Sequence, residues 1–155
     1  MTRQLALIGV GEMGGVFARG FLRNGYTVIP VTRSESMEQV SEAYPDINAV
    51  LVAVAEKDLH PVLEQVPAVW RDRLILLQNE LLPHDWLQHE LHNPTVISVW
   101  FEKKKGQDAK VIVPSPAYGP HAQLLYDALN LLEIPVRILP DQQELLEELV
   151  LKNLY

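Results

Sequence analysis

The sequence predicts an α/β fold in which helices cover both faces of a doubly wound, mostly parallel sheet. A glycine-rich turn directly follows the apolar run at residues 5–8. Apolar runs of strand length alternate with helical patterns along the chain, and the run at residues 49–54 is apolar without interruption. Such a run suits a central parallel strand that is buried on both faces.

The glycine turn predicts a dinucleotide site. Gly9, Gly11 and Gly14 follow the spacing G-x-G-x-x-G between a strand pattern and a helix pattern. A strand that continues as a helix through such a turn directs backbone N–H groups at one point, where the helix dipole also attracts phosphate. Gly9 would permit the turn, Gly11 would let a diphosphate approach, and Gly14 would allow close packing. The remaining predicted contacts in the turn are Val10, Glu12 and Met13.

The residues after the turn complete one βαβ unit. Asn24-Gly25 ends the helix, because glycine adopts the left-handed conformation common there, and residues 26–31 form a β-rich run. This order is typical of a Rossmann-type sheet. The apolar face of the intervening helix consists of Val16, Phe17, Gly20 and Phe21.

The end of the second strand favours NADP. An NAD site usually has a carboxylate there, about 20 residues past the glycines, whereas this chain has Thr32, Arg33 and Ser34. A guanidinium pairs with a 2′-phosphate through two hydrogen bonds, and the two hydroxyls can donate to the same oxygens. Glu35 is the opposing observation, since a shift of one residue would bring this acid to the ribose.

Two further segments should reach the same edge of the sheet, because ligands bind at the carboxyl ends of its strands. Ala55 and Glu56 follow the third strand and should flank the adenine or the diphosphate. Asn79 follows a fourth strand at residues 74–77 and should face the nicotinamide or the substrate, unless it merely forms a turn.

The remaining pattern extends this alternation. Asp58 could cap a helix with Pro61 in its first turn, where the missing N–H costs little. Lys103, Lys104 and Lys105 are predicted to form the solvated tip of an antiparallel hairpin, with an anion-binding role as the alternative. The other predicted elements are helices at residues 83–91 and from Pro120, hairpin strands at residues 96–101 and 110–113, and a last strand at residues 136–139.

Composition excludes several classes of function. The 155 residues suffice for one domain, and the net charge of −7 argues against a nucleic-acid surface. The chain has no cysteine and no apolar stretch of membrane length, so we expect a cytoplasmic protein without contact to a membrane. His89 and His92 have helical spacing but no third ligand, so no metal site is predicted.

The last helix predicts a partner. Asp141 and Glu144 form a capping box, and one side of the helix is apolar through Leu145, Leu146, Leu149, Val150 and Leu154. We expect residues 1–140 to form the Rossmann NADP-binding domain and residues 141–155 to begin a helix. That helix would lead to a helical domain that either is missing from this sequence or comes from a partner. The second alternative predicts a homo-oligomer, such as a dimer, formed through this helix.

With these motifs, the chain resembles the N-terminal NADP domain of the ketopantoate reductase family, within the 6-phosphogluconate and β-hydroxyacid dehydrogenase superfamily. The resemblance implies an oxidoreductase that reduces a small oxo acid in a cleft between this domain and a helical one. It makes Lys152 the general acid and Asn79 a contact near the nicotinamide. The family's later catalytic asparagine and helical domain are missing, so this chain alone should bind nucleotide without turnover.

Two other functions fit the same residues. A deazaflavin-dependent NADP reductase shares the glycine turn and a basic residue after the second strand, but would give Lys152 no role. A non-catalytic NADP-sensing module would instead use its terminal helix to change subunit contacts when nucleotide binds.

Overall fold

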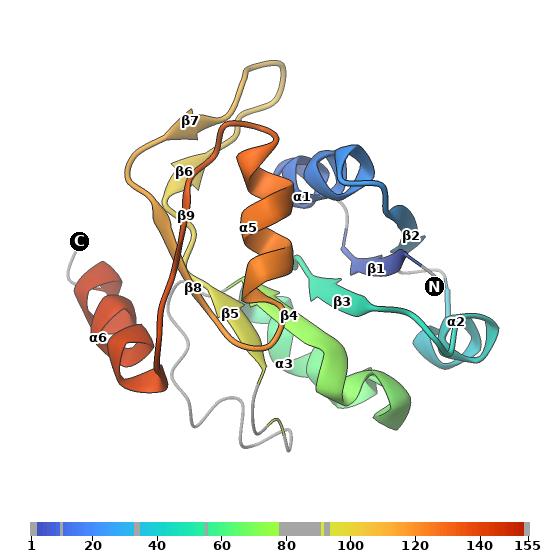
Figure 1. Ribbon diagram of the computed structural model, residues 1–155. Helices are drawn as coiled ribbons and strands as arrows, with labels where there is room; N and C mark the ends of the chain where they lie inside the picture. The colour runs from blue at the N-terminus through green and yellow to red at the C-terminus, as the bar shows by residue number, and fades with distance from the viewer. Residues whose placement is uncertain are drawn as a thin grey trace.

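The computed structural model describes residues 3–9, 11–32, 35–54, 56–77, 91 and 94–153, without the side chains of residues 56, 57 and 150–153. In this part of the chain, seven strands form one sheet in the order β2-β1-β3-β4-β5-β8-β9 (Figure 1). The strands are β1 Gln4–Ile8, β2 Thr27–Val31, β3 Ala49–Val52, β4 Leu74–Leu77, β5 Thr95–Ile97, β8 Ser115–Tyr118 and β9 Val136–Ile138.

The sheet is mostly parallel, which confirms the predicted fold class. The pairs from β2 through β5 are parallel, as is the pair β8 and β9. Only β5 and β8 pair in the antiparallel sense within this sheet as described. Pro30 lies in β2, an edge strand, where a residue without an N–H is tolerated.

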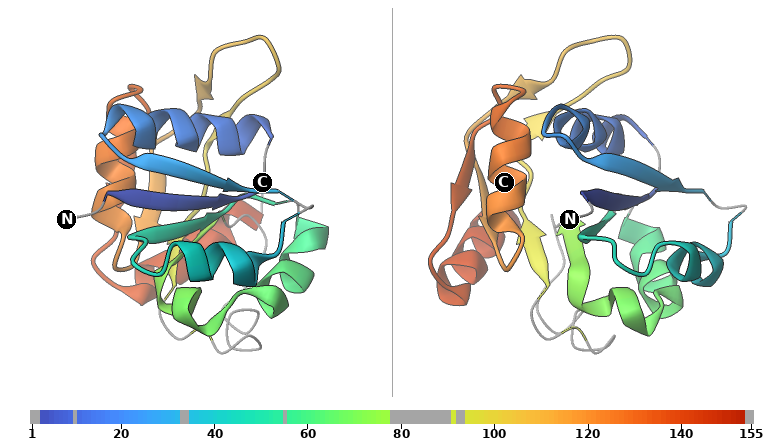
Figure 2. Two further views of the ribbon diagram at one scale, coloured as in Figure 1. Left: turned by 90° about the vertical axis from the view of Figure 1, so that its right-hand side faces the viewer. Right: turned by 45° about the vertical axis from the view of Figure 1, so that its right-hand side comes forward.

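The two sheet faces are covered separately by helices (Figure 2). On β1, Leu5 and Leu7 pack with α1 and α5, whereas Ala6 and Ile8 pack with α2, α3 and α6, because successive side chains of a strand point to opposite faces. The helices are α1 Glu12–Arg23, α2 Met37–Ala43, α3 Glu56–Gln65, the 3₁₀ helix η1 Ala68–Arg73, α5 Ala122–Asn130 and α6 Gln142–Asn153.

The predicted hairpin is present, but its first strand is interrupted. The run at residues 96–101 divides into β5 and β6 (Phe101–Glu102), and β6 pairs in the antiparallel sense with β7 (Lys110–Val111) as a separate small sheet. At the interruption, the Trp100 N–H donates to Ser115 Oγ at 2.9 Å. Strand β8 was not predicted, since its segment contains Pro116 and follows Pro114.

The start of α3 differs from the prediction. Strand β3 ends at Val52, before the end of the apolar run at residues 49–54, and α3 begins at Glu56. Pro61 is therefore inside the helix and Asp58 is not its cap. The proline removes one hydrogen bond of the helix, which the packing of Leu59 and Leu63 in the core offsets. The predicted helix at residues 83–91 lies outside the described residues except for Leu91.

The last helix packs on its own domain. The Glu144 N–H donates to Asp141 Oδ1 at 2.9 Å, which confirms the predicted start. Leu145 and Leu149 are 1% and 0% exposed and belong to the core cluster that also contains Val96 and Leu139. The domain itself therefore covers these two residues of the predicted apolar face, and the homo-oligomer through this helix stays a prediction. No helix in the described ranges is long and apolar enough to cross a membrane.

Candidate nucleotide-binding site

The glycine turn is built where β1 meets α1. Gly9 has a φ of 94°, and a Cβ at this position would lie 2.4 Å from the Ala53 carbonyl oxygen. Both facts require glycine, the first for conformation and the second for space. A Cβ on Gly14 would lie 3.3 Å from the Gly9 carbonyl oxygen and 3.6 Å from Ala53 Cβ, so helix and strand approach closely here.

The first turn of α1 has backbone donors without a side-chain cap. Gly11 is the N-cap of α1 and has no side chain to accept their hydrogen bonds. The Gly15 N–H donates to the Gly11 carbonyl at 2.9 Å, so the N–H groups before it have no carbonyl one turn back within the helix. A Cβ on Gly11 would meet nothing within 4 Å. This combination of donors and space fits a diphosphate.

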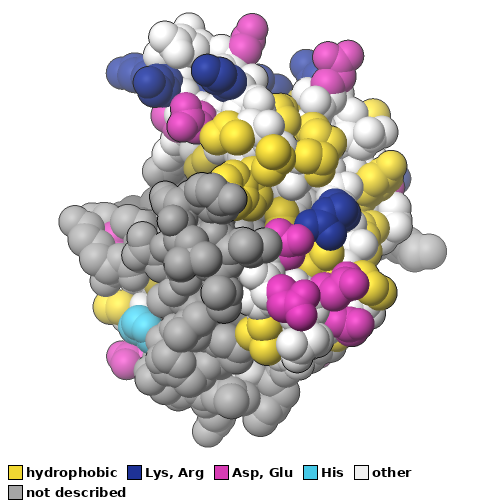
Figure 3. Space-filling view, turned by 90° about the vertical axis from the view of Figure 1, so that its left-hand side faces the viewer, with side chains coloured by type: hydrophobic (Ala, Val, Ile, Leu, Met, Phe, Trp, Pro, Cys, Tyr) yellow, Lys and Arg dark blue, Asp and Glu magenta, His cyan; other side chains and the backbone are white. Residues whose placement is uncertain are grey.

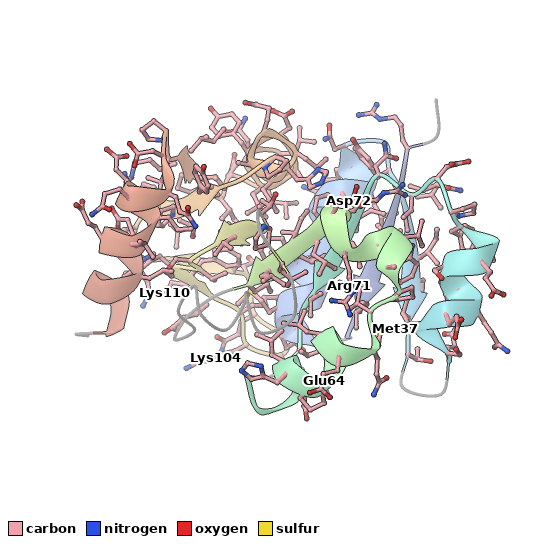
Figure 4. The ribbon with its side chains drawn as sticks, turned by 90° about the horizontal axis from the view of Figure 1, so that it is seen from below. Met37, Glu64, Arg71, Asp72, Lys104 and Lys110 are labelled. Atoms are coloured by element: carbon pink, nitrogen blue, oxygen red, sulfur yellow. The ribbon has the colours of Figure 1, made fainter. Side chains whose placement is uncertain are left out.

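A cleft of about 570 Å³ lies beside this turn, at the carboxyl ends of β1, β2 and β3. Its floor is formed by Ile8, Gly9, Val31 and Ala53, and its far wall comes from α2 and α3. Met37, which lines the cleft, is labelled between the ribbons of these two helices in Figure 4. The other residues that line the cleft are Thr32, Glu35, Val54, Asp58, Pro61, Val62 and Gln65.

A carboxylate stands at the end of β2. Thr32 Oγ1 donates to Glu35 Oε1 at 3.0 Å, and the Thr32 N–H donates to the same oxygen at 3.4 Å. The Thr32 hydroxyl, predicted to donate to a 2′-phosphate, is therefore engaged with an acid that also lines the cleft. An exposed carboxylate at this position can accept hydrogen bonds from ribose hydroxyls, as in NAD sites.

Several predicted site residues lie beyond what the structure describes. Val10, Arg33, Ser34, Ala55 and Asn79 are outside the described residues. Glu56 begins α3 and Lys152 lies in the last turn of α6, but their side chains are not described. Their roles therefore stay predictions.

The position of Lys103 differs from the predicted solvated tip of three lysines. Its Nζ lies 3.2 Å from Glu12 Oε2, and its side chain is only 10% exposed, whereas Lys104 and Lys105 are exposed. Basic side chains gather at the top of the face in Figure 3, the end of the molecule where Figure 1 places the hairpin. The sequence held no signal for this contact, because 91 residues separate its partners.

His121 lies away from the cleft. Its backbone N–H donates to Oγ1 of Thr95, the first residue of β5, at 2.8 Å, so it belongs to the amino edge of the sheet. Burial lowers the pKa of His121, with a smaller lowering by Arg73 and an opposing effect of Asp72. In the part of the chain that the structure describes, no cluster of three or more His, Asp or Glu could hold a metal ion.

The sheet order, the glycine turn and the cleft at the strand ends define a Rossmann-type α/β domain. The solved structures that resemble it include ketopantoate reductases, an arogenate dehydrogenase and a D-mandelate dehydrogenase, which confirms at the level of fold the resemblance seen in the sequence. No family model matches the chain, and no curated protein matches it.

Three of these structures illustrate the likeness. A dimeric ketopantoate reductase from Staphylococcus aureus has a TM-score of 0.61 at 17% identity, covering 92% of this chain and 62% of its own. A 2-dehydropantoate 2-reductase from Methylococcus capsulatus has a TM-score of 0.64 at 12% identity, covering 92% and 59%. A D-mandelate dehydrogenase in complex with NADH has a TM-score of 0.57 at 12% identity, covering 92% and 57%. This chain thus spans about 60% of the ketopantoate reductases' length.

Proposed function

We propose that this chain is the NADP-binding part of an oxidoreductase that reduces a small oxo acid. The observation that carries the proposal is the start of α1, where the first backbone N–H groups receive no side-chain cap and a Cβ added to the N-cap Gly11 would meet nothing within 4 Å. The cleft next to it has room for the adenosine half of a dinucleotide. The likeness to ketopantoate reductases supports the substrate class.

The chemistry of such an enzyme would be divided between cofactor and protein. Bound reduced nicotinamide supplies a hydride to the carbonyl carbon of the oxo acid. Lys152 would give a proton to the carbonyl oxygen, so that the product is a hydroxy acid. Asn79 would hold the nicotinamide or the substrate through its amide. The backbone of the turn at Gly9 and Gly11 would fix the diphosphate, and Arg33 with Ser34 would bind the 2′-phosphate.

NAD is the second candidate cofactor. Glu35 favours it, because this carboxylate lines the cleft and holds the Thr32 hydroxyl. A carboxylate next to a 2′-phosphate is unfavourable, but next to a 2′-hydroxyl it accepts a hydrogen bond. One resembling structure, the D-mandelate dehydrogenase, contains NADH. Titration of the chain with NADPH and NADH decides between these candidates by their dissociation constants.

A substitution at Gly11 tests the cradle itself. Gly11→Ala adds a methyl group that meets no protein atom within 4 Å, so the fold should persist while the diphosphate loses its close approach. Gly15→Ala is the matched control, because Gly15 is exposed in the same helix and its added methyl group also meets nothing. In calorimetric titrations with NADPH, we expect at least about a tenfold loss for Gly11→Ala and none for Gly15→Ala. Equal affinities for both variants would refute the proposal.

The reductase and the sensing alternative differ in turnover. In the natural protein, Lys152→Ala should abolish oxidation of NADPH by an oxo acid and spare NADPH binding. A protein that binds NADPH, shows no turnover with any oxo acid and changes its sedimentation on binding would instead be a sensor.

A further inference from the structure

We infer that Lys103 is a diphosphate-binding residue of the nucleotide site and that Glu12 holds its ammonium group in place when no nucleotide is bound. This inference rests on the proposed function and extends it to a residue outside the βαβ unit. The ligand class is the diphosphate of a dinucleotide.

The base of the hairpin is fixed against α1. Phe101 of β6 is 4% exposed, and its ring centroid lies 5.9 Å from that of Phe17 in α1. The Ile112 N–H, on the opposite strand, donates to the Trp100 carbonyl at 2.9 Å. Because β6 is anchored in this way, the residues that follow it return to the first turn of α1.

The ammonium group of Lys103 is held by two acceptors. Its Nζ lies 3.2 Å from Glu12 Oε2 and 2.9 Å from the Lys104 carbonyl oxygen. That carbonyl also accepts the Gln107 N–H at 3.0 Å, so it belongs to a closed turn. An ammonium group has three donors, and acceptors among the described residues use two of them. These two contacts fix the position of the ammonium group.

The placement of Lys103 is unusual for a surface ion pair. Its side chain is 10% exposed, although lysine is rarely buried, and its partner Glu12 is 45% exposed. A half-exposed pair contributes little to folding, so stability alone gives no reason to bury this lysine. Lys104 and Lys110 from the same hairpin, both labelled in Figure 4, are exposed.

The negative charges of Glu12 and of a diphosphate explain why the side chain of Lys103 is largely buried at this place. Glu12 directly follows Gly11 and is the first residue of α1, so the lysine that contacts its carboxylate is held near the N-terminus of this helix, where the diphosphate would bind. A carboxylate close to a diphosphate repels it unless a cation lies between the two groups. Lys103 already contacts the carboxylate and can bridge the two groups. The pair therefore makes an acid in the first turn of α1 compatible with an anionic ligand.

The test compares variants of Lys103 and Glu12 in calorimetric titrations of the whole chain. Lys103→Met should weaken NADPH binding about tenfold, the loss of one charged hydrogen bond, while Lys103→Arg keeps most of the affinity. Lys104→Met, the matched control, should bind as the wild type does. The double variant Glu12→Gln with Lys103→Met should bind NADPH more tightly than Lys103→Met alone, because the carboxylate that the lysine no longer bridges is removed. Adenosine 2′-phosphate, which lacks the diphosphate, should bind Lys103→Met and wild type equally.

The outcomes separate the two proposals. If the wild type binds NADPH and Lys103→Met binds it with the same affinity, the role of Lys103 is overturned and the proposed function stands. An equal loss for NADPH and adenosine 2′-phosphate also overturns it, since the effect would not depend on the diphosphate. Absence of NADPH binding by the wild type overturns both proposals. If Lys103→Met has a lowered melting temperature, equal NADPH affinities of the double variant and Lys103→Met overturn the inference instead.

Discussion

The carboxylate of Glu35 offers the sharpest test of cofactor choice. Glu35→Gln removes one negative charge from the wall of the cleft and keeps the size of the side chain. The hydrogen bond from Thr32 Oγ1 at 3.0 Å can still form to the amide oxygen. Because the group is exposed, we expect the free energy of unfolding to change by less than about 1 kcal/mol.

The effect on binding follows from Coulomb's law. A 2′-phosphate with about two charges, at about 5 Å from Glu35 in water, is repelled by roughly 1.5 kcal/mol, so Glu35→Gln should bind NADPH about tenfold more tightly. NADH should lose about 1 kcal/mol, because a charged acceptor of its ribose hydroxyl becomes neutral. The ratio of the two affinities should therefore move towards NADPH by about 30- to 100-fold.

Fluorescence titration with NADPH and NADH measures both affinities. Glu38→Gln is the control, since it removes an equal charge from an exposed position in the first turn of α2 that does not line the cleft. If Glu38→Gln changes the ratio as much as Glu35→Gln does, the effect comes from net charge and the assignment of Glu35 to the ribose is wrong.

Two further predictions concern stability. Gly20→Ala places a Cβ 2.8 Å from the Ala128 carbonyl oxygen of α5, so urea denaturation should show a loss of about 1–3 kcal/mol, whereas Gly15→Ala should gain about 0.5–1 kcal/mol from helix propensity. Burial lowers the folded-state pKa of His121 below its ordinary 6.5, so the unfolded state binds more protons. The contribution of His121 to the free energy of unfolding should be complete above about pH 6.5 and fall as the pH drops below that value. In thermal melts between about pH 5 and 8, His121→Gln should flatten this pH dependence. An unchanged slope would contradict the lowered pKa of His121.

The sequence alone determined the sheet's central strands and the glycine turn. Residues 5–8 and 74–77 were predicted as strands and lie in β1 and β4, because short apolar runs bounded by turn residues suit strands that are buried on both faces of a sheet. The need for glycine at position 9 was also predicted from the sequence, since the spacing of the motif specifies a turn that other residues rarely adopt. The start of α6 followed from Asp141 and Glu144, whose capping contact spans three residues.

Only the tertiary structure decided what depends on distant residues. Strand β8, with Pro116 inside it, exists because β5 and β9 flank it on both sides, which no local propensity encodes. The burial of Leu149 by the chain's own sheet and the contact between Lys103 and Glu12 likewise depend on where α6 and the hairpin return. Local pattern fixes what neighbouring residues can form, whereas these contacts arise from packing between segments that the sequence holds far apart.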